Sequence, residues 1–305
     1  MSFNSTDFVL TGDINSPTYA AVLGIEAIIG MIANVAVLLM TLYQKKSWNQ
    51  PSTIFFTSLL LSNLIIALWY LMSSIAVGAE EWIFGSTFEQ RNATCLFNAY
   101  LLWSGRMIAT MTLATVSFDR FLFVAKPYSY KRFMRPRVAL ILVIGVWVMS
   151  SLINTIPFSG FGVYGYFSLN GICTLLYAYS GLYLIILFVV YAIIFVIIAV
   201  TSFWTFCFTR RFMQDQAEIA GGSVYQSRKK RLFGIFGYML LSYVIALLPS
   251  YIIGTLNMFY HLPAYVHLGV VVAYGPEIVV IVKNWWNKIK STPRNQDRNL
   301  NNIAN

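Results

Sequence analysis

Seven long runs of apolar residues alternate with short polar stretches along this chain. A helix that crosses a membrane needs about 20 predominantly apolar residues to span a hydrocarbon core of roughly 30 Å, and each run is long enough to do so. The pattern therefore predicts an all-α membrane protein built as a seven-transmembrane helix bundle. The predicted spans are 20–43, 52–77, 96–124, 138–158, 177–208, 232–260 and 264–282.

A short amphipathic segment follows the seventh run. Trp285, Trp286 and Ile289 lie on one side of a helical turn there, and lysines lie on the other. This arrangement predicts a short interfacial eighth helix that rests on the membrane surface. We therefore expect three parts, namely a tail at 1–19, a seven-transmembrane domain with its interfacial helix at 20–290, and a tail at 291–305.

Composition and charge add an orientation. The chain has 58% hydrophobic and 10% charged residues, whereas soluble domains carry about 25% charged residues. Its net charge of +10 comes from basic residues in the connections on one side of the predicted membrane and after the last span, while Arg91 alone lies in the connections of the other side. Basic loops stay in the cytoplasm, so we expect a multi-pass plasma-membrane protein with an extracellular N-terminus and a cytoplasmic C-terminus. The charge is a topology signal and predicts no nucleic-acid partner.

The start of the chain bears on insertion and modification. The first eighteen residues lack Lys and Arg, so we expect the first span to act as its own insertion signal. Asn4 and Asn92 each begin an N-glycosylation triplet on the predicted outer side. Cys95 and Cys173 are also predicted outside, where oxidising conditions favour a disulfide between them. Two free thiols are the alternative.

The third run has different chemistry at its two ends. It begins at Cys95 and ends 25 residues later at Asp119-Arg120-Phe121, a separation of about 37 Å along a helix. This spacing resembles the third helix of rhodopsin-like (class A) G-protein-coupled receptors, which has a cysteine at the outer end and an Asp-Arg-Tyr triplet at the inner end. Other spans carry residues that match the family's positions, namely Asn34, Trp147, Pro157, Pro249 and Pro276. Pro249 and Pro276 are expected to kink their helices.

The resemblance implies a receptor that transduces an extracellular ligand signal to a heterotrimeric G protein. Asp119 is then expected to hold Arg120 inward in the resting state and to release it when the helices separate. The alternative is an arginine that only anchors the helix at the membrane interface.

Departures from the family pattern support a second hypothesis. Asn63 stands where the family has its sodium-binding aspartate. In the sixth span, Ala246-Leu247-Leu248-Pro249 stands where the family has Cys-Trp-Leu-Pro, so the family's tryptophan is missing. The seventh span reads Gly275-Pro276 and lacks the tyrosine that follows in the family. A seven-helix scaffold or decoy receptor without G-protein activation is therefore the alternative function. A transporter would require inverted repeats, which the sequence does not contain.

The same positions restrict the ligand. Amine receptors carry an aspartate where this chain has Leu102, and opsins carry a lysine where it has Gly269. Arg106 lies in the outer half of the third span, where a charge is costly unless it is paired. We predict that it anchors a small or lipid-like ligand with a carboxylate, between the third, sixth and seventh helices. A structural ion pair with Glu26, or hydrogen bonds to carbonyls, is the alternative. The candidate ligand-binding residues are Leu102, Trp103, Arg106, Tyr251 and Tyr265.

Signatures of other chemistry are missing from the sequence. His261 and His267 are the two histidines and do not have the spacing of metal ligands. The chain has no paired carboxylates, no nucleophile with a base and no phosphate loop. We therefore expect no enzyme, no cofactor and no metal. The expected partners are the ligand, a G protein and membrane lipids.

Overall fold

The computed structural model describes residues 8–43 and 50–219. Within them, five helices are long and apolar enough to cross a membrane. They correspond to the first five predicted spans. Predicted features that lie outside the described residues are the sixth and seventh spans, the interfacial helix, Asn4, Pro249, Tyr251, Tyr265 and Pro276. The five long helices are α1 (Ser16–Tyr43), α2 (Pro51–Gly78), α3 (Phe88–Ala125), α5 (Pro136–Thr155) and α6 (Gly181–Ile219).

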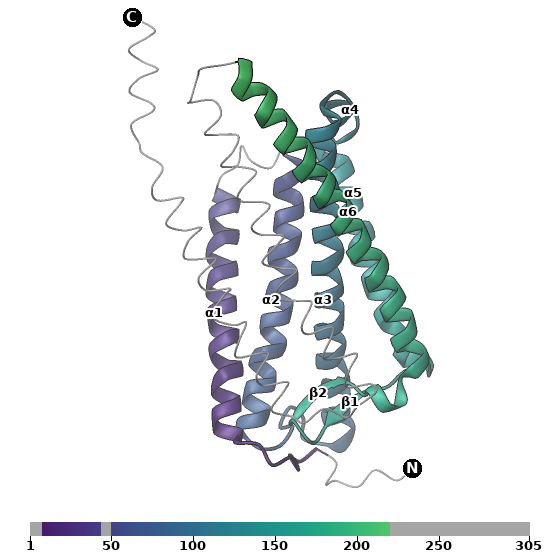
Figure 1. Ribbon diagram of the computed structural model, residues 1–305. Helices are drawn as coiled ribbons and strands as arrows, with labels where there is room; N and C mark the ends of the chain where they lie inside the picture. The colour runs from purple at the N-terminus through teal and green to yellow at the C-terminus, as the bar shows by residue number, and fades with distance from the viewer. Residues whose placement is uncertain (1–7, 44–49, 220–305) are drawn as a thin grey trace, which may run out of the picture.

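The helices form a bundle around α3. In Figure 1, α1, α2 and α3 run side by side, and α6 leans across the bundle. The α2 helix packs against α1, α3 and α5, and α3 also packs against α6. At the junction of three helices, Trp147 of α5 donates to the Ser58 hydroxyl of α2 at 2.9 Å, and Ser58 pairs with Thr112 of α3 at 3.2 Å.

The α3 helix begins eight residues before its predicted start at 96. Thr87 caps it, because its hydroxyl accepts the Gln90 backbone N–H at 3.3 Å, which satisfies one of the free donors at a helix N-terminus. The added turns carry polar residues, including Glu89 and Arg91. Hydropathy marks only the apolar part of a helix, so the prediction did not include these turns.

A β-hairpin and a short helix lie in connections that the hydropathy pattern left without structure. Strands β1 (Tyr164–Phe167) and β2 (Ile172–Leu175) form an antiparallel hairpin that pairs Tyr166 with Cys173. Gly171 in its turn has φ +69°, a backbone conformation that glycine adopts without steric cost. At the opposite end of the bundle, the short helix α4 spans Pro127–Phe133. Two single-turn 3-10 helices, η2 (Ile156–Ser159) and η3 (Tyr177–Tyr179), flank the hairpin.

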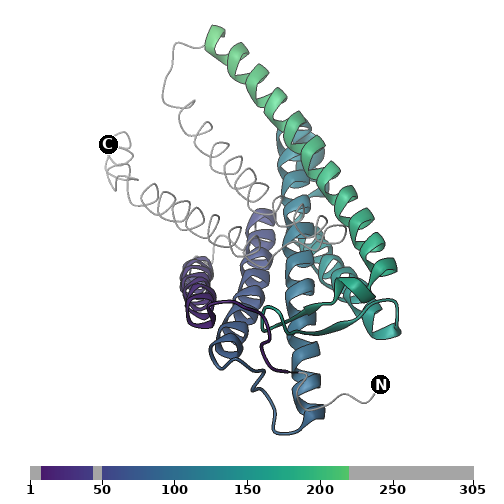
Figure 2. The same cartoon turned by 60° about the horizontal axis from the view of Figure 1, so that its bottom comes forward.

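We call the two ends of the bundle the hairpin end and the α4 end. Figure 2 shows the connecting segments crossing the hairpin end. Residues 8–15, here called the N-terminal strap, lie across it: Leu10 donates to the Glu80 carbonyl at 2.8 Å, and Thr11 donates to the Ser168 carbonyl at 2.9 Å. Phe8 of the strap is buried against Phe88 and Tyr166. The strap therefore joins the 79–87 loop to the hairpin.

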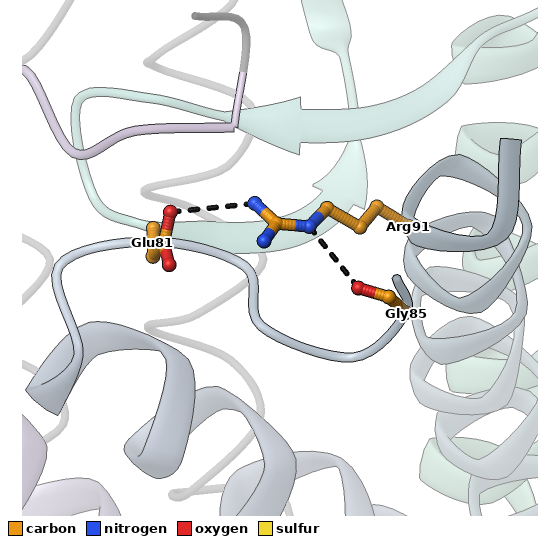
Figure 3. Close-up of polar contacts among 3 residues, drawn as sticks. All are labelled: Glu81, Gly85 and Arg91. Carbon is orange, nitrogen blue, oxygen red and sulfur yellow. Dashed lines mark hydrogen bonds and ion pairs between the residues drawn. The ribbon is translucent and has the colours of Figure 1, made fainter. Parts of the chain in front are cut away.

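An arginine holds the 79–87 loop against α3. Figure 3 shows Arg91 extending from α3, with Nε donating to the Gly85 carbonyl at 3.2 Å and Nη1 donating to Glu81 Oε2 at 3.3 Å. Trp82 of the same loop is fully buried, and its indole N–H donates to the Thr94 hydroxyl at 2.9 Å. Both contacts reach the first two turns of α3.

Candidate functional site

A buried ion pair lies near the α4 end of α3. Arg120 Nη2 is 2.9 Å from Asp119 Oδ2, and the side chains of Arg120 and Asp119 are 17% and 0% exposed. The sequence predicted both residues and their pairing. Because breaking a buried pair leaves an uncompensated charge, this contact restrains Arg120 strongly.

Tyr130 of α4 completes this cluster. Its hydroxyl donates to Asp119 Oδ1 at 3.1 Å, so Asp119 binds both Tyr130 and Arg120. Burial, reinforced by the Asp119 charge, raises the pKa of Tyr130 to about 12, and the hydroxyl keeps the proton that it donates. The Phe123 ring lies 5.2 Å from the Tyr130 ring and 5.9 Å from the Arg120 guanidinium carbon.

Sequence reasoning missed Tyr130. Pro127 occupies the first turn of α4, a position where proline favours helix initiation. That signal predicts a short helix here, but the contact with Asp119 depends on how α4 folds back toward α3.

The second candidate group surrounds Arg106, in the hairpin half of α3. Its guanidinium lies close to the Tyr70 hydroxyl of α2 and within electrostatic range of Tyr177 in η3. Glu26 of α1 also interacts electrostatically with Arg106. These partners come from the side of the bundle formed by α1, α2 and the hairpin connection.

Two predicted ligand residues on α3 are buried inside the protein. Leu102 and Trp103 are 2% and 6% exposed. The Trp103 indole N–H donates to the Thr174 hydroxyl of β2 at 3.3 Å, and its ring meets Tyr177 edge-on at a centroid distance of 6.3 Å. Trp103 therefore connects α3 to the hairpin, one turn of the helix from Arg106.

The hairpin is attached to α3 covalently. Cys95 and Cys173 form a disulfide and are both fully buried, which confirms the predicted bridge. Trp69 of α2 adds a second tie, because its indole N–H donates to the Cys173 carbonyl at 3.0 Å. The residues near Arg106 are thus covered by a segment held from two helices.

A buried polar network fixes the other side of the hairpin. Asn154 of α5 accepts the Tyr183 hydroxyl of α6 at 2.9 Å through its side chain, and its backbone carbonyl accepts the Tyr164 hydroxyl of β1 at 3.1 Å. All three residues are nearly or fully buried. The sequence had not singled out any of them, because an asparagine and two tyrosines far apart in the chain carry no local signal.

The Asn92 triplet has a structural role in addition to its sequence signal. Asn92 is exposed on α3, as an acceptor for a glycan must be. The Thr94 hydroxyl, however, donates to the Phe84 carbonyl and accepts the Trp82 N–H. Thr94 therefore helps to hold the 79–87 loop.

The described residues contain no cluster with metal-binding composition. Between residues 8 and 43 and between 50 and 219, no group of three His, Cys, Asp or Glu side chains is placed to hold a metal ion. The chemistry available at the two candidate groups is hydrogen bonding and charge pairing.

Known proteins place these features in a family. The sequence model of the protein family "7 transmembrane receptor (rhodopsin family)" matches residues 33–274 of this chain. Similar curated proteins include a rhodopsin of Mizuhopecten yessoensis described as GQ-coupled, 28% identical over 148 residues that make up 48% of this chain and 28% of that protein. Succinate receptor 1 of Rattus norvegicus is 29% identical over 135 residues, 44% of this chain and 40% of that receptor. The chain thus spans less than half the length of these relatives.

A solved structure has the same architecture. The crystal structure of squid rhodopsin aligns with a TM-score of 0.72 at 22% identity, covering 86% of this chain and 75% of that one. This similarity shows a shared fold. Since the family match extends over most of the sequence, the chain belongs to the rhodopsin family of 7 transmembrane receptors, which are G-protein-coupled receptors with a seven-helix membrane fold.

Proposed function

We propose that the protein is a plasma-membrane receptor that transduces an extracellular ligand signal to a heterotrimeric G protein. The observation that carries the proposal is the Asp119–Arg120 pair at 2.9 Å, with Asp119 fully buried. It lies on the same continuous helix as Arg106 and as Cys95 of the disulfide to the hairpin. One rigid element therefore connects a candidate ligand site to a candidate G-protein contact.

The distribution of basic residues supports the orientation. The described residues at the α4 end include Lys126, Arg132, Arg135 and Arg137, whereas Arg91 lies at the hairpin end. By the positive-inside rule, the α4 end is cytoplasmic and the hairpin end is extracellular. The ligand then approaches from the hairpin end, and the G protein binds at the α4 end.

The polar cluster at the α4 end supports a two-state mechanism. In the described state, Asp119 binds Arg120 and Tyr130 together. A G protein that offers new partners to Arg120 compensates for the loss of this pair. A ligand that binds one helix arrangement more tightly shifts the population toward that arrangement by its difference in affinity. Arg120 becomes available to the G protein in the shifted state.

The ligand is proposed to carry an acid. Arg106 lies in the hairpin half of the bundle, and an arginine holds a carboxylate through two parallel hydrogen bonds. The name of one relative, succinate receptor 1, identifies a ligand with carboxylates for that protein and supports a carboxylate in the ligand here. Trp103 and Tyr177 lie beside this position, and Tyr251 and Tyr265 remain proposed contributors.

Substitution of Arg120 tests the signalling half of the proposal. We expect Arg120→Ala to abolish G-protein activation while the receptor still reaches the cell surface, because alanine cannot make the contact with the G protein that the released arginine makes. Arg132→Ala, at an exposed arginine of α4, is the matched control and should retain activation. The measurement is activation of a full panel of G-protein subtypes, with surface labelling in parallel.

A wild-type protein that activates no G protein under any condition would transfer the assignment to the alternative function, a scaffold or decoy receptor. The loss of the family's tryptophan before Pro249 and of its tyrosine after Pro276 favours that alternative.

Substitution of Arg106 tests the ligand half. Arg106→Ala should weaken binding of an acid much more than binding of its neutral methyl ester, because only the acid uses the guanidinium charge. Equal weakening of acid and ester, or no change for either, contradicts the acid anchor.

A further inference from the structure

Two opposite charges lie in the hairpin half of the described helices, away from the helix ends. Across α1, α2, α3, α5 and α6 as described, these are Glu26 of α1 and Arg106 of α3, both partly buried. Each is costly in a membrane-spanning segment unless it meets a compensating group. Their relative placement therefore constrains what binds beside them.

The contacts between α1 and α2 place Glu26 level with Tyr70. A Cβ added at Gly30 would lie 3.6 Å from Ala67, and one added at Gly78 would lie 3.5 Å from Ala20. These two contacts define an antiparallel register. Interpolation between them brings Glu26 opposite the turn of α2 that contains Tyr70.

The contacts between α2 and α3 place Tyr70 on the hairpin side of Arg106. Gly105 of α3 lies close to Ile66 of α2, because a Cβ added at Gly105 would lie 3.0 Å from the Ile66 side chain. Tyr70 is therefore about one helical turn nearer the hairpin end than the α2 residues opposite Arg106. Helical side chains tilt toward the N-terminus of their helix, which for α3 is the hairpin end. Arg106 extends in this direction, toward the Tyr70 hydroxyl with which it interacts.

Tyr70 thus lies between the two charges. Glu26 is level with a point on α3 about six or seven residues before Arg106, or about 10 Å along the axis at 1.5 Å per residue. The arginine side chain extends toward the hairpin end and shortens this axial gap, and the two charged groups interact electrostatically. A short flexible molecule has the dimensions to connect them.

We propose that the ligand is amphoteric, with an acid at one end that binds Arg106 and an ammonium group at the other end that binds Glu26, as in an ω-amino acid. This inference rests on the proposed acid anchor and goes beyond it by naming the second charge. A dicarboxylate of equal length would bring its second carboxylate next to Glu26, where like charges repel. An ammonium group satisfies the Glu26 carboxylate, so the site discriminates by charge complementarity.

Matched probes test the second charge. Full-length receptor in lipid nanodiscs is titrated with three series of equal chain length, covering short to medium carbon chains: ω-amino acids, unsubstituted monoacids and dicarboxylates. We expect the wild type to prefer an ω-amino acid at one length. Glu26→Gln should weaken that binding roughly thirtyfold or more, the usual effect of removing one partner of a buried charge pair, while monoacid binding stays unchanged.

A second variant gives a result even if Glu26→Gln does not fold. Glu26→Asp keeps the charge and shortens the side chain by one methylene group, so the preferred ω-amino acid should become one carbon longer. The matched control is Glu89→Gln, at an exposed position in the first turn of α3, which should leave every affinity unchanged.

The outcomes separate this inference from the function on which it rests. Wild-type preference for monoacids or dicarboxylates at every length, or equal loss of all three series in Glu26→Gln, overturns the amphoteric ligand and leaves the Arg106 acid anchor intact. Binding of no acid in any series, with Arg106→Gln identical to the wild type, overturns both. A preferred length that does not change in Glu26→Asp also overturns the ammonium contact.

Discussion

The two ends of α3 are held in different ways. At the hairpin end, a disulfide joins α3 to β2, Trp69 and Trp103 bind the hairpin, and the strap and Arg91 tie down the neighbouring connections. At the α4 end, an ion pair and one tyrosine hydroxyl bind Asp119, beside a small apolar cluster of Phe55, Met134 and Ala139. One end is fixed covalently and the other by polar contacts that can exchange partners.

This difference suits a protein that recognises at one end and switches at the other. A fixed hairpin keeps the groups around Arg106 in place, which reduces the ordering cost of binding. A buried ion pair resists opening unless a new partner replaces the lost one. Four substitutions, taken from the largest expected effect to the smallest, break or sharpen the contrast.

Loss of the disulfide should have the largest effect. The bridge closes a loop with a sequence separation of 78 residues, and a crosslink of this span contributes about 4.5 kcal/mol by the chain-entropy account. We expect Cys95→Ser or Cys173→Ser to reduce surface expression strongly. Cys207→Ser, at the free cysteine of α6, is the control and should express normally. Normal surface levels of both variants, measured by flow cytometry, would contradict the covalent tether.

Loss of the Tyr130 hydroxyl should loosen the α4 end. Tyr130→Phe removes a hydrogen bond of 3.1 Å to the Asp119 carboxylate, and bonds to charged groups contribute roughly 1.5–3 kcal/mol. We expect a severalfold rise in basal G-protein activation, because Asp119 then holds Arg120 without its second partner. Tyr128→Phe changes a tyrosine that is 83% exposed and should leave basal activity unaltered. Equal basal activity in the two variants would mean that the Tyr130 hydrogen bond to Asp119 does not restrain Arg120.

Loss of the Trp69 hydrogen bond should weaken the hairpin end without breaking the disulfide. Trp69→Phe leaves the buried Cys173 carbonyl without its 3.0 Å donor, which costs about 1–3 kcal/mol. We expect a lower melting temperature for the purified receptor, with the disulfide still detected by mass spectrometry. The control, Trp204→Phe, changes a tryptophan that is 51% exposed on α6. A melting temperature that falls equally in both variants indicates a general aromatic effect.

Loss of the Arg91 charge should have the smallest effect. Arg91 and Glu81 pair at 3.3 Å with side chains 29% and 41% exposed, and such pairs contribute under about 1 kcal/mol. Arg91→Gln should therefore lower the melting temperature only slightly, and high salt should give the wild type a similar small loss. A large drop for Arg91→Gln would mean that its bond to the Gly85 carbonyl, and not the ion pair, holds the loop.

Local sequence determined the parts of this molecule that depend on the membrane. Runs of apolar residues located all five described membrane helices, because burial in lipid requires a long continuous hydrophobic segment whatever its neighbours are. Cys95 and Cys173 were correctly paired from their predicted compartment, and Asp119 and Arg120 are adjacent in the chain. Each of these predictions needed only composition, spacing or sidedness.

Apart from the disulfide, the tertiary structure decided the contacts between residues that are distant in the sequence. Asp119 meets Tyr130 because α4 folds back, Arg106 meets Tyr70 because α2 and α3 pack in one antiparallel register, and Thr94 receives the Trp82 indole because a loop closes over α3. The hairpin is similar, since its strands are stabilised by contacts with α3 and not by a hydropathy signal of their own. Partner choice is set by the packing of whole helices, and no local pattern encodes which side chains that packing brings together.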